Sequence, residues 1–118
     1  MPWKLGGFKL DGERLNVRSE DAFEQNPLWM LEIFRTAQVN ALDIHPRALQ
    51  LIARNLKRID EPMRHDAAAG QIFLDILLAE QGPELTLRRM SEAGVLGRFI
   101  PDFGRVVGQT QFNMYHVY

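Results

Sequence analysis

The 118-residue sequence contains no cysteine. A disulfide scaffold and a thiol nucleophile are therefore excluded, and so are zinc sites built on cysteine sulfur. An excess of charge of either sign is also missing, because 14 basic residues oppose 15 acidic residues and leave a net charge of −1. Such a chain has no overall attraction to nucleic acid or to an anionic membrane. Any partner must be recognised through a local surface.

Long apolar runs are missing as well. The longest, such as Leu28 to Leu31, fall far short of the roughly 20 residues that span a bilayer. No charged and then apolar signal segment opens the sequence. These two absences predict a cytoplasmic protein. The length of the chain suits a single domain with one core.

One strand signal is present, near the start of the sequence. Phe8 and Leu10 alternate with polar residues before an Asp11-Gly12 turn, and Leu15 and Val17 alternate after it. This pattern predicts a short β-hairpin. Because two strands are marginal alone, the hairpin must pack on the helical body or on protein outside this sequence.

The rest of the sequence favours helices. Ser19 precedes a run of acids that suits a capped first helical turn. Further on, apolar residues recur at helical spacing in four segments separated by Asn, Gly or Pro. These segments, with the residues that we expect to be buried, are 27–39 (Leu28, Leu31, Phe34, Ala37), 46–59 (Leu49, Ile52, Leu56, Ile59), 66–82 (Ile72, Phe73, Ile76, Leu77) and 84–100 (Leu85, Met90, Val95, Leu96, Phe99).

These features predict an all-α fold, namely a compact antiparallel bundle of three to five helices with a short N-terminal β-hairpin. The hairpin would occupy residues 1–18 and the bundle residues 19–102. Residues 103–118 then carry apolar and aromatic side chains as far as the last residue, which is unusual for a chain end. We interpret them as the lead-in to a further domain. The alternative is an exposed patch through which the chain self-associates.

The three histidines show no metal-binding spacing. His45, His65 and His116 are far apart in the sequence, so no two of them stand three or four residues apart on a helix. Capping, solvation or a local hydrogen bond is favoured over metal ligation for His45 and His65. For His116, a structural role is favoured over a catalytic one.

Other polar groups are also better explained by structure than by catalysis. The adjacent acids Glu20-Asp21 and Asp60-Glu61 suit first helical turns, where carboxylates are stabilised by the helix dipole. Neither Ser19 nor Ser91 lies in a nucleophile-elbow pattern. Two basic groups, Arg88-Arg89 and Arg54 with Lys57-Arg58, could hold a phosphate or an acidic partner, but solvated helix faces look the same in sequence.

Three stretches of the sequence resemble the middle of the bacterial PII uridylyltransferase/uridylyl-removing enzyme family, in that family's order. They are FKLDGERLNV (Phe8–Val17), FEQNPLWMLEIFRTAQ (Phe23–Gln38) and LTLRRMSEAGVLGRFIPDFGRVVGQTQFNMYHVY (Leu85–Tyr118). Asn26 stands where an aspartate is common in the family, and Thr110 stands where a methionine is common. Together the stretches span nearly the whole chain.

The resemblance implies a large parent protein with several domains. An N-terminal nucleotidyltransferase domain would attach UMP from UTP, with magnesium, to the nitrogen-signalling PII protein. An HD-type hydrolase domain would remove it, and C-terminal ACT domains would sense glutamine. This chain would lie between the first two domains, and the catalytic motifs of both would lie outside it.

The sequence therefore predicts a helical linker domain that fixes two active sites relative to each other. We expect no catalytic, cofactor-binding or metal-ligating residue within it, and we expect its partners to be the flanking domains. Two alternatives remain. One is an independent protein-interaction or dimerisation module, and the less favoured one is a small metal hydrolase that uses the three histidines.

Overall fold

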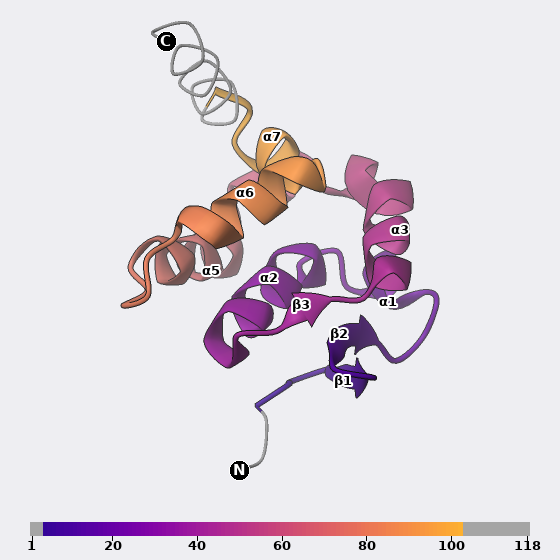
Figure 1. The fold of residues 1–118 in the computed structure, drawn as a ribbon. Coiled ribbons are helices and arrows are strands. Elements are labelled where there is room, and N and C mark those ends of the chain that lie inside the picture. The colour runs from indigo at the N-terminus through magenta and orange to yellow at the C-terminus, as the bar shows by residue number, and fades with distance from the viewer. Residues whose placement is uncertain (1–3, 103–118) are drawn as a thin grey trace, which may run out of the picture.

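A computed structural model describes residues 4–102 of the chain, and the fold is mostly helical (Figure 1). The described residues form seven α-helices, one 3-10 helix and a small sheet near the N-terminus. The elements are β1 (Phe8–Asp11), β2 (Arg14–Val17), α1 (Ala22–Gln25), α2 (Trp29–Asn40), β3 (Asp43–Ile44), α3 (Pro46–Asn55), η1 (Leu56–Arg58), α4 (Glu61–Arg64), α5 (Ala67–Leu77), α6 (Glu84–Glu92) and α7 (Val95–Phe99). The segment 103–118, with His116, lies outside the described residues.

The predicted hairpin is present. β1 and β2 pair antiparallel, with Phe8 opposite Val17 and Leu10 opposite Leu15. Gly12 has a φ of +67° at the first position of the two-residue turn, the position that a type II′ hairpin turn reserves for glycine.

A third strand was not predicted from the sequence. β3 is only two residues long and pairs in parallel with β2, with Leu15 opposite Ile44. The backbone N–H of His45 donates to the carbonyl of Leu15 at 2.8 Å, which extends this pairing by one hydrogen bond. Two residues are too few to show an alternating pattern, so the sequence offered no signal for this strand.

The hairpin packs on the helical body, the first of the two possibilities raised by its sequence. Phe8 and Leu15 are fully buried. The rings of Phe8 and Trp29 meet edge to face, with centroids 5.3 Å apart, a geometry that aromatic pairs favour. The sheet is thereby fixed against α2.

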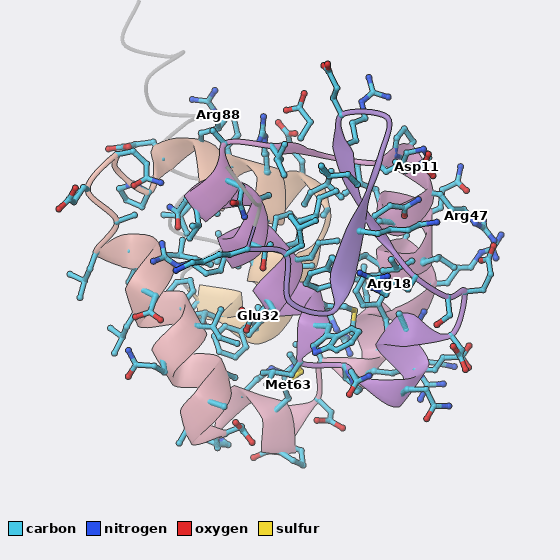
Figure 2. All side chains as sticks on the ribbon, turned by 90° about the horizontal axis from the view of Figure 1, so that it is seen from below. Asp11, Arg18, Glu32, Arg47, Met63 and Arg88 are labelled. Carbon is cyan, nitrogen blue, oxygen red and sulfur yellow. The ribbon has the colours of Figure 1, made fainter. Side chains whose placement is uncertain are left out.

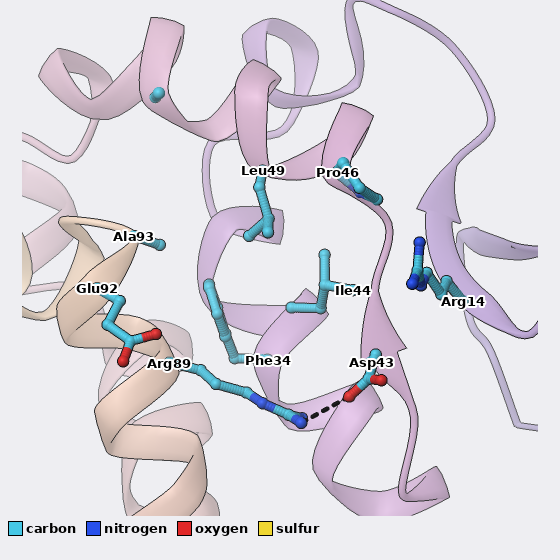
Figure 3. Close-up of a pocket in the computed structure, with 10 residues that line it drawn as sticks. Arg14, Phe34, Asp43, Ile44, Pro46, Leu49, Arg89, Glu92 and Ala93 are labelled. Carbon is cyan, nitrogen blue, oxygen red and sulfur yellow. Dashed lines mark hydrogen bonds and ion pairs between the residues drawn. The ribbon is translucent and has the colours of Figure 1, made fainter.

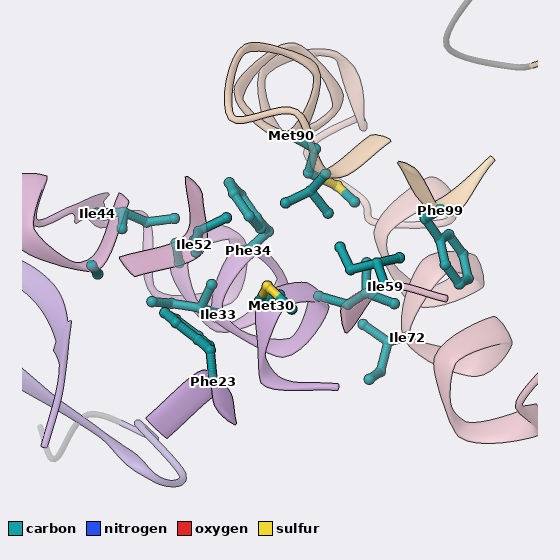
Figure 4. Packing of buried hydrophobic residues seen from close by; sticks show 14 of the residues in the cluster. Phe23, Met30, Ile33, Phe34, Ile44, Ile52, Ile59, Ile72, Met90 and Phe99 are labelled. Carbon is teal, nitrogen blue, oxygen red and sulfur yellow. The ribbon is translucent and has the colours of Figure 1, made fainter. Parts of the chain in front are cut away.

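Helix α2 lies at the centre of the core. It packs against α1, α5, α6 and β3, and Met30, Leu31, Ile33 and Phe34 are each at most 1% exposed. Figure 4 shows Met30, Ile33 and Phe34 among core side chains from both halves of the fold. Each such side chain contributes roughly 1.5 to 3 kcal/mol to folding. The prediction that this segment forms a largely buried helix is confirmed.

Two leucines that we expected in the core lie at the surface instead. Leu49 is 38% exposed and Leu85 is 53% exposed. α3 ends at Asn55 and continues as the 3-10 helix η1, so Leu56 and Ile59 do not continue the α-helical register of Leu49. The buried side chains are Ala48, Leu51, Ile52 and Asn55 in α3, and Thr86 and Met90 in α6. Of these, Ile52 and Met90 were predicted to be buried.

Acidic side chains cap two of the helices. The Asp66 carboxylate accepts from the backbone N–H groups of Ala68 and Ala69, at 2.8 and 3.1 Å, at the start of α5. Asp60 caps the short helix α4 in the same way. The expected cap at Ser19 is wrong, because α1 begins three residues later and the Ser19 hydroxyl donates to Asp21 instead.

A buried glutamine joins α2 to α5 and to the segment that follows it. The side-chain N–H of Gln38 donates to the carbonyl of Ile76 at 3.2 Å, and the Gln81 side chain donates to the carbonyl of Gln38 at 3.0 Å. Every buried polar side-chain atom of the described part of the chain has a hydrogen-bond partner. Such satisfied buried groups fix the relative position of helices, because breaking one bond leaves a buried group unpaired.

Charged side chains extend from the periphery of the fold, as Figure 2 shows for Arg47 and Arg88. None of the helices in residues 4–102 combines the length and the apolar character needed to cross a membrane.

Candidate functional site

A groove with an apolar floor opens between α3, β3 and α6, and it has a volume of about 530 Å³ (Figure 3). The floor includes the buried side chains of Phe34 and Ile44 and the exposed side chain of Leu49. We call this hollow the α6 groove. Its lining residues are Arg14, Phe34, Asp43, Ile44, Pro46, Leu49, Ala53, Arg89, Glu92 and Ala93.

An ion pair joins the two sides of the α6 groove. Arg89 Nη2 lies 2.6 Å from Asp43 Oδ1, and Arg89 Nη1 donates to the carbonyl of Leu42 at 3.3 Å. The Asp43 side chain is 67% exposed and that of Arg89 is 34% exposed. An ion pair this open contributes only about 0 to 1 kcal/mol to stability, so its main effect is to orient α6 against β3.

The same ion pair lines a second hollow, which lies between α2 and α6 and has a volume of about 440 Å³. Leu85, which is 53% exposed, lines this second hollow. Two exposed leucines therefore lie in adjoining hollows that share Asp43 and Arg89. Apolar pockets beside a fixed charge pair suit the uptake of apolar side chains from another protein segment, which the charges would orient.

Of the three histidines, the structure describes His45 and His65, and each has its own local surroundings. The Nδ1 atom of His45 accepts from the backbone N–H of Arg47 at 3.0 Å, so His45 is the N-cap of α3. This local hydrogen bond is among the roles favoured from the sequence. His65 is largely exposed, with Nε2 4.0 Å from Glu61 Oε1. Within residues 4–102, no three His, Cys, Asp or Glu side chains gather where they could hold a metal ion.

The basic groups named from the sequence have different surroundings. Arg54, Lys57 and Arg58 share a shallow hollow with three acids, Glu20, Asp21 and Glu24. Arg88 is exposed, whereas its neighbour Arg89 reaches the α6 groove. Sequence reasoning did not identify the groove, because Leu49 was expected in the core and β3 gave no signal.

Residues 4–102 therefore form a mostly helical domain with two adjoining hollows that share Asp43 and Arg89. Comparison with known proteins gives its family. The family model described as the uridylyltransferase GlnD third domain matches residues 8–99. The chain belongs to this family, which confirms the resemblance seen in the sequence.

Curated relatives match over nearly the whole chain, and three are named as bifunctional uridylyltransferase/uridylyl-removing enzymes. The protein from Azospirillum brasilense is 58% identical over 97% of this chain. Those from Novosphingobium aromaticivorans and Rhodospirillum rubrum are 48% and 50% identical over 98% and 97% of it. The chain spans only 12 to 13% of the length of these relatives. No solved structure matches the chain.

Proposed function

We propose that this chain is a non-catalytic helical domain of a bifunctional uridylyltransferase/uridylyl-removing enzyme, in which it fixes the transferase and hydrolase domains relative to each other. The main observation behind this proposal is that residues 8–99 match a single family domain, while the chain spans only about an eighth of the length of its relatives. The parent enzyme would act in the cytoplasm on the PII signalling protein, under control by glutamine. Magnesium and UTP would bind to its other domains.

Two structural properties support this role. The core around α2 is continuous, and the buried Gln38 and Ile76 carbonyl link helices that are far apart in sequence. A body of this kind transmits a displacement from one side to the other rather than absorbing it. The α6 groove supplies a surface on which a neighbouring domain can dock with apolar side chains.

The segment 103–118 would then lead into the hydrolase domain, with its apolar residues packed against that domain. This role stays a prediction, because the segment lies outside the described residues.

A second candidate function is an independent interaction or dimerisation module. One observation favours it: Leu78 at the end of α5 is 78% exposed, and Leu74, one turn earlier on the same helix, is 49% exposed. Exposed apolar side chains on one helix face are a common feature of association surfaces. Sedimentation of the unchanged chain and of the Leu78→Lys variant tests this alternative. If the chain dimerises through this face, the unchanged chain should form a concentration-dependent species that the variant does not form.

The scaffold role is tested in the full-length enzyme by placing a charge in the α6 groove. Leu49→Lys replaces a side chain that is already partly exposed, so the variant should still fold. It puts an ammonium group where an apolar contact with the neighbouring domain is expected. Val39→Lys is the matched control, because Val39 is 51% exposed and lines neither hollow. We expect Leu49→Lys to change the ratio of uridylyl transfer to uridylyl removal and its response to glutamine. An unchanged ratio with both variants folded would contradict the proposal.

A further inference from the structure

We propose that Arg64 and Arg98 form a binding site for a carboxylate side chain that comes from outside this chain. The proposal rests on the proposed function, because it places the carboxylate on another domain of the same long enzyme. The site is separate from the α6 groove, whose lining includes neither arginine.

The two guanidinium groups converge on one backbone carbonyl. Arg64 Nη2 and Arg98 Nη2 both donate to the carbonyl of Ile59, at 3.5 and 3.4 Å. Arg64 Nε also donates to the carbonyl of Arg98 at 2.6 Å, and Arg98 Nε donates to the carbonyl of Leu56 at 3.1 Å. These bonds join α4, α7 and η1, and they hold two positive charges close together.

No acidic side chain of this chain neutralises the pair. All of its 15 Asp and Glu residues lie between Asp11 and Asp102, within the described residues, and none of the ion pairs there involves Arg64 or Arg98. Both arginines are only partly exposed, so water screens their mutual repulsion less than it would at a fully exposed site. A pair of like charges held in this way is stabilised by an anion.

The geometry leaves donors for such an anion. A guanidinium group has five N–H donors, and hydrogen bonds within residues 4–102 occupy two on each arginine. The two guanidinium groups share one acceptor, the carbonyl of Ile59, and their remaining donors could bind the two oxygens of a carboxylate, which arginine binds in bidentate fashion.

We favour a carboxylate of the same enzyme as the occupant. The chain is only 12% of the length of its relative from Azospirillum brasilense, so most of the protein surface that can meet this domain belongs to the rest of the polypeptide. That surface is present at a high effective concentration because it is tethered.

Zero-length cross-linking in the full-length enzyme tests the site. In Arg64→Lys and, separately, Arg98→Lys, a carbodiimide would couple the introduced amine to a carboxylate only where the two groups form an ion pair. Arg18→Lys is the matched control, because Arg18 is an exposed arginine that lines neither of the two hollows. Cross-linked peptides are identified by mass spectrometry, and thermal unfolding checks that each variant is folded.

We expect either variant at position 64 or 98 to give a cross-link to an Asp or Glu outside these 118 residues, and we expect this cross-link to be absent from Arg18→Lys. It should be lost in 1 M salt, where the screening length falls to about 3 Å. No cross-link from either variant, or cross-links only to acids within this chain, would overturn the proposal. If neither variant gives such a cross-link while the groove variant Leu49→Lys still alters the activity ratio, this site alone fails and the scaffold role stands.

Discussion

The indole ring of Trp29 lies directly against the backbone of Gly7. A β-carbon at position 7 would be 2.3 Å from Cη2 and 2.6 Å from Cζ2 of that ring. Since Trp29 also packs edge to face on Phe8, the ring cannot move away without losing this contact. The absence of a side chain at Gly7 is therefore what allows the hairpin to approach α2.

Gly7→Ala should destabilise the chain because its methyl group overlaps Trp29. We expect a loss of about 1 to 3 kcal/mol in the free energy of unfolding, the usual cost of overpacking. Gly70→Ala is the control, since a β-carbon there meets nothing within 4 Å, and alanine is the better helix former. Urea unfolding measures both. Equal stability of the two variants would show that the contact of Gly7 with Trp29 does not constrain the fold.

The turn between α6 and α7 requires glycine for its backbone conformation. Gly94 has a φ of +84°, and a β-carbon there would be 2.8 Å from Leu56 Cδ1. Gly94→Ala should cost roughly 1 to 2 kcal/mol from the left-handed conformation alone. Gly97→Ala, three residues later in α7, has open space and should be neutral or stabilising. Thermal unfolding measures the stability of both variants. A loss for Gly94→Ala alone indicates strain at position 94, whereas an equal loss for both would show that this region does not accept any added methyl group.

The cap of α5 should contribute measurably to stability. Asp66→Ala removes an acceptor for two backbone N–H groups, which costs about 0.5 to 2 kcal/mol at helix N-caps. Ser19→Ala is a useful comparison, because the Ser19 hydroxyl donates to Asp21 and caps no helix. Its effect on the free energy of unfolding should stay within about 0.5 kcal/mol. A larger loss for Ser19→Ala than for Asp66→Ala would be inconsistent with the observed caps.

The ion pair between Asp43 and Arg89 should orient the α6 groove more than it stabilises the fold. A double-mutant cycle with Asp43→Asn and Arg89→Gln should give a coupling free energy of about 0.2 to 1 kcal/mol. This coupling should decrease in 1 M salt, where screening acts over about 3 Å. A coupling well above this range, insensitive to salt, would show that the pair is a stabilising element of the core.

Much of the fold was predictable because strong local signals coincide with the tertiary structure. The helical segment that was expected to begin at Asp66 is α5 (Ala67–Leu77), which Asp66 caps. The apolar residues Leu31, Phe34 and Ala37, which recur at helical spacing in α2, are buried. The chain is mostly helical, as predicted. Three to five helices were expected, and seven α-helices are present in residues 4–102, because α1, α4 and α7 are single turns.

The candidate site was not predictable in the same way. The sequence could not show that α3 changes to a 3-10 helix at Leu56, which shifts the buried face away from Leu49. Nor could it show that Asp43 would meet Arg89, since this contact joins residues 46 positions apart. The α6 groove depends on both features, which arise from tertiary packing rather than from local preference.

Hydroxyl-radical footprinting of the full-length enzyme tests the central claim most directly, because it reports the exposure of leucine side chains without a mutation. In the structure, Leu49, Leu85 and Leu78 are 38%, 53% and 78% exposed. If another domain docks in the hollows beside Asp43 and Arg89, it will cover Leu49 and Leu85. Their reactivities relative to Leu78 should then be far lower than the ratios of these exposed fractions. Reactivities in proportion to the three exposures would mean that both hollows stay open to solvent, and the claim that this domain docks its neighbours there would be wrong.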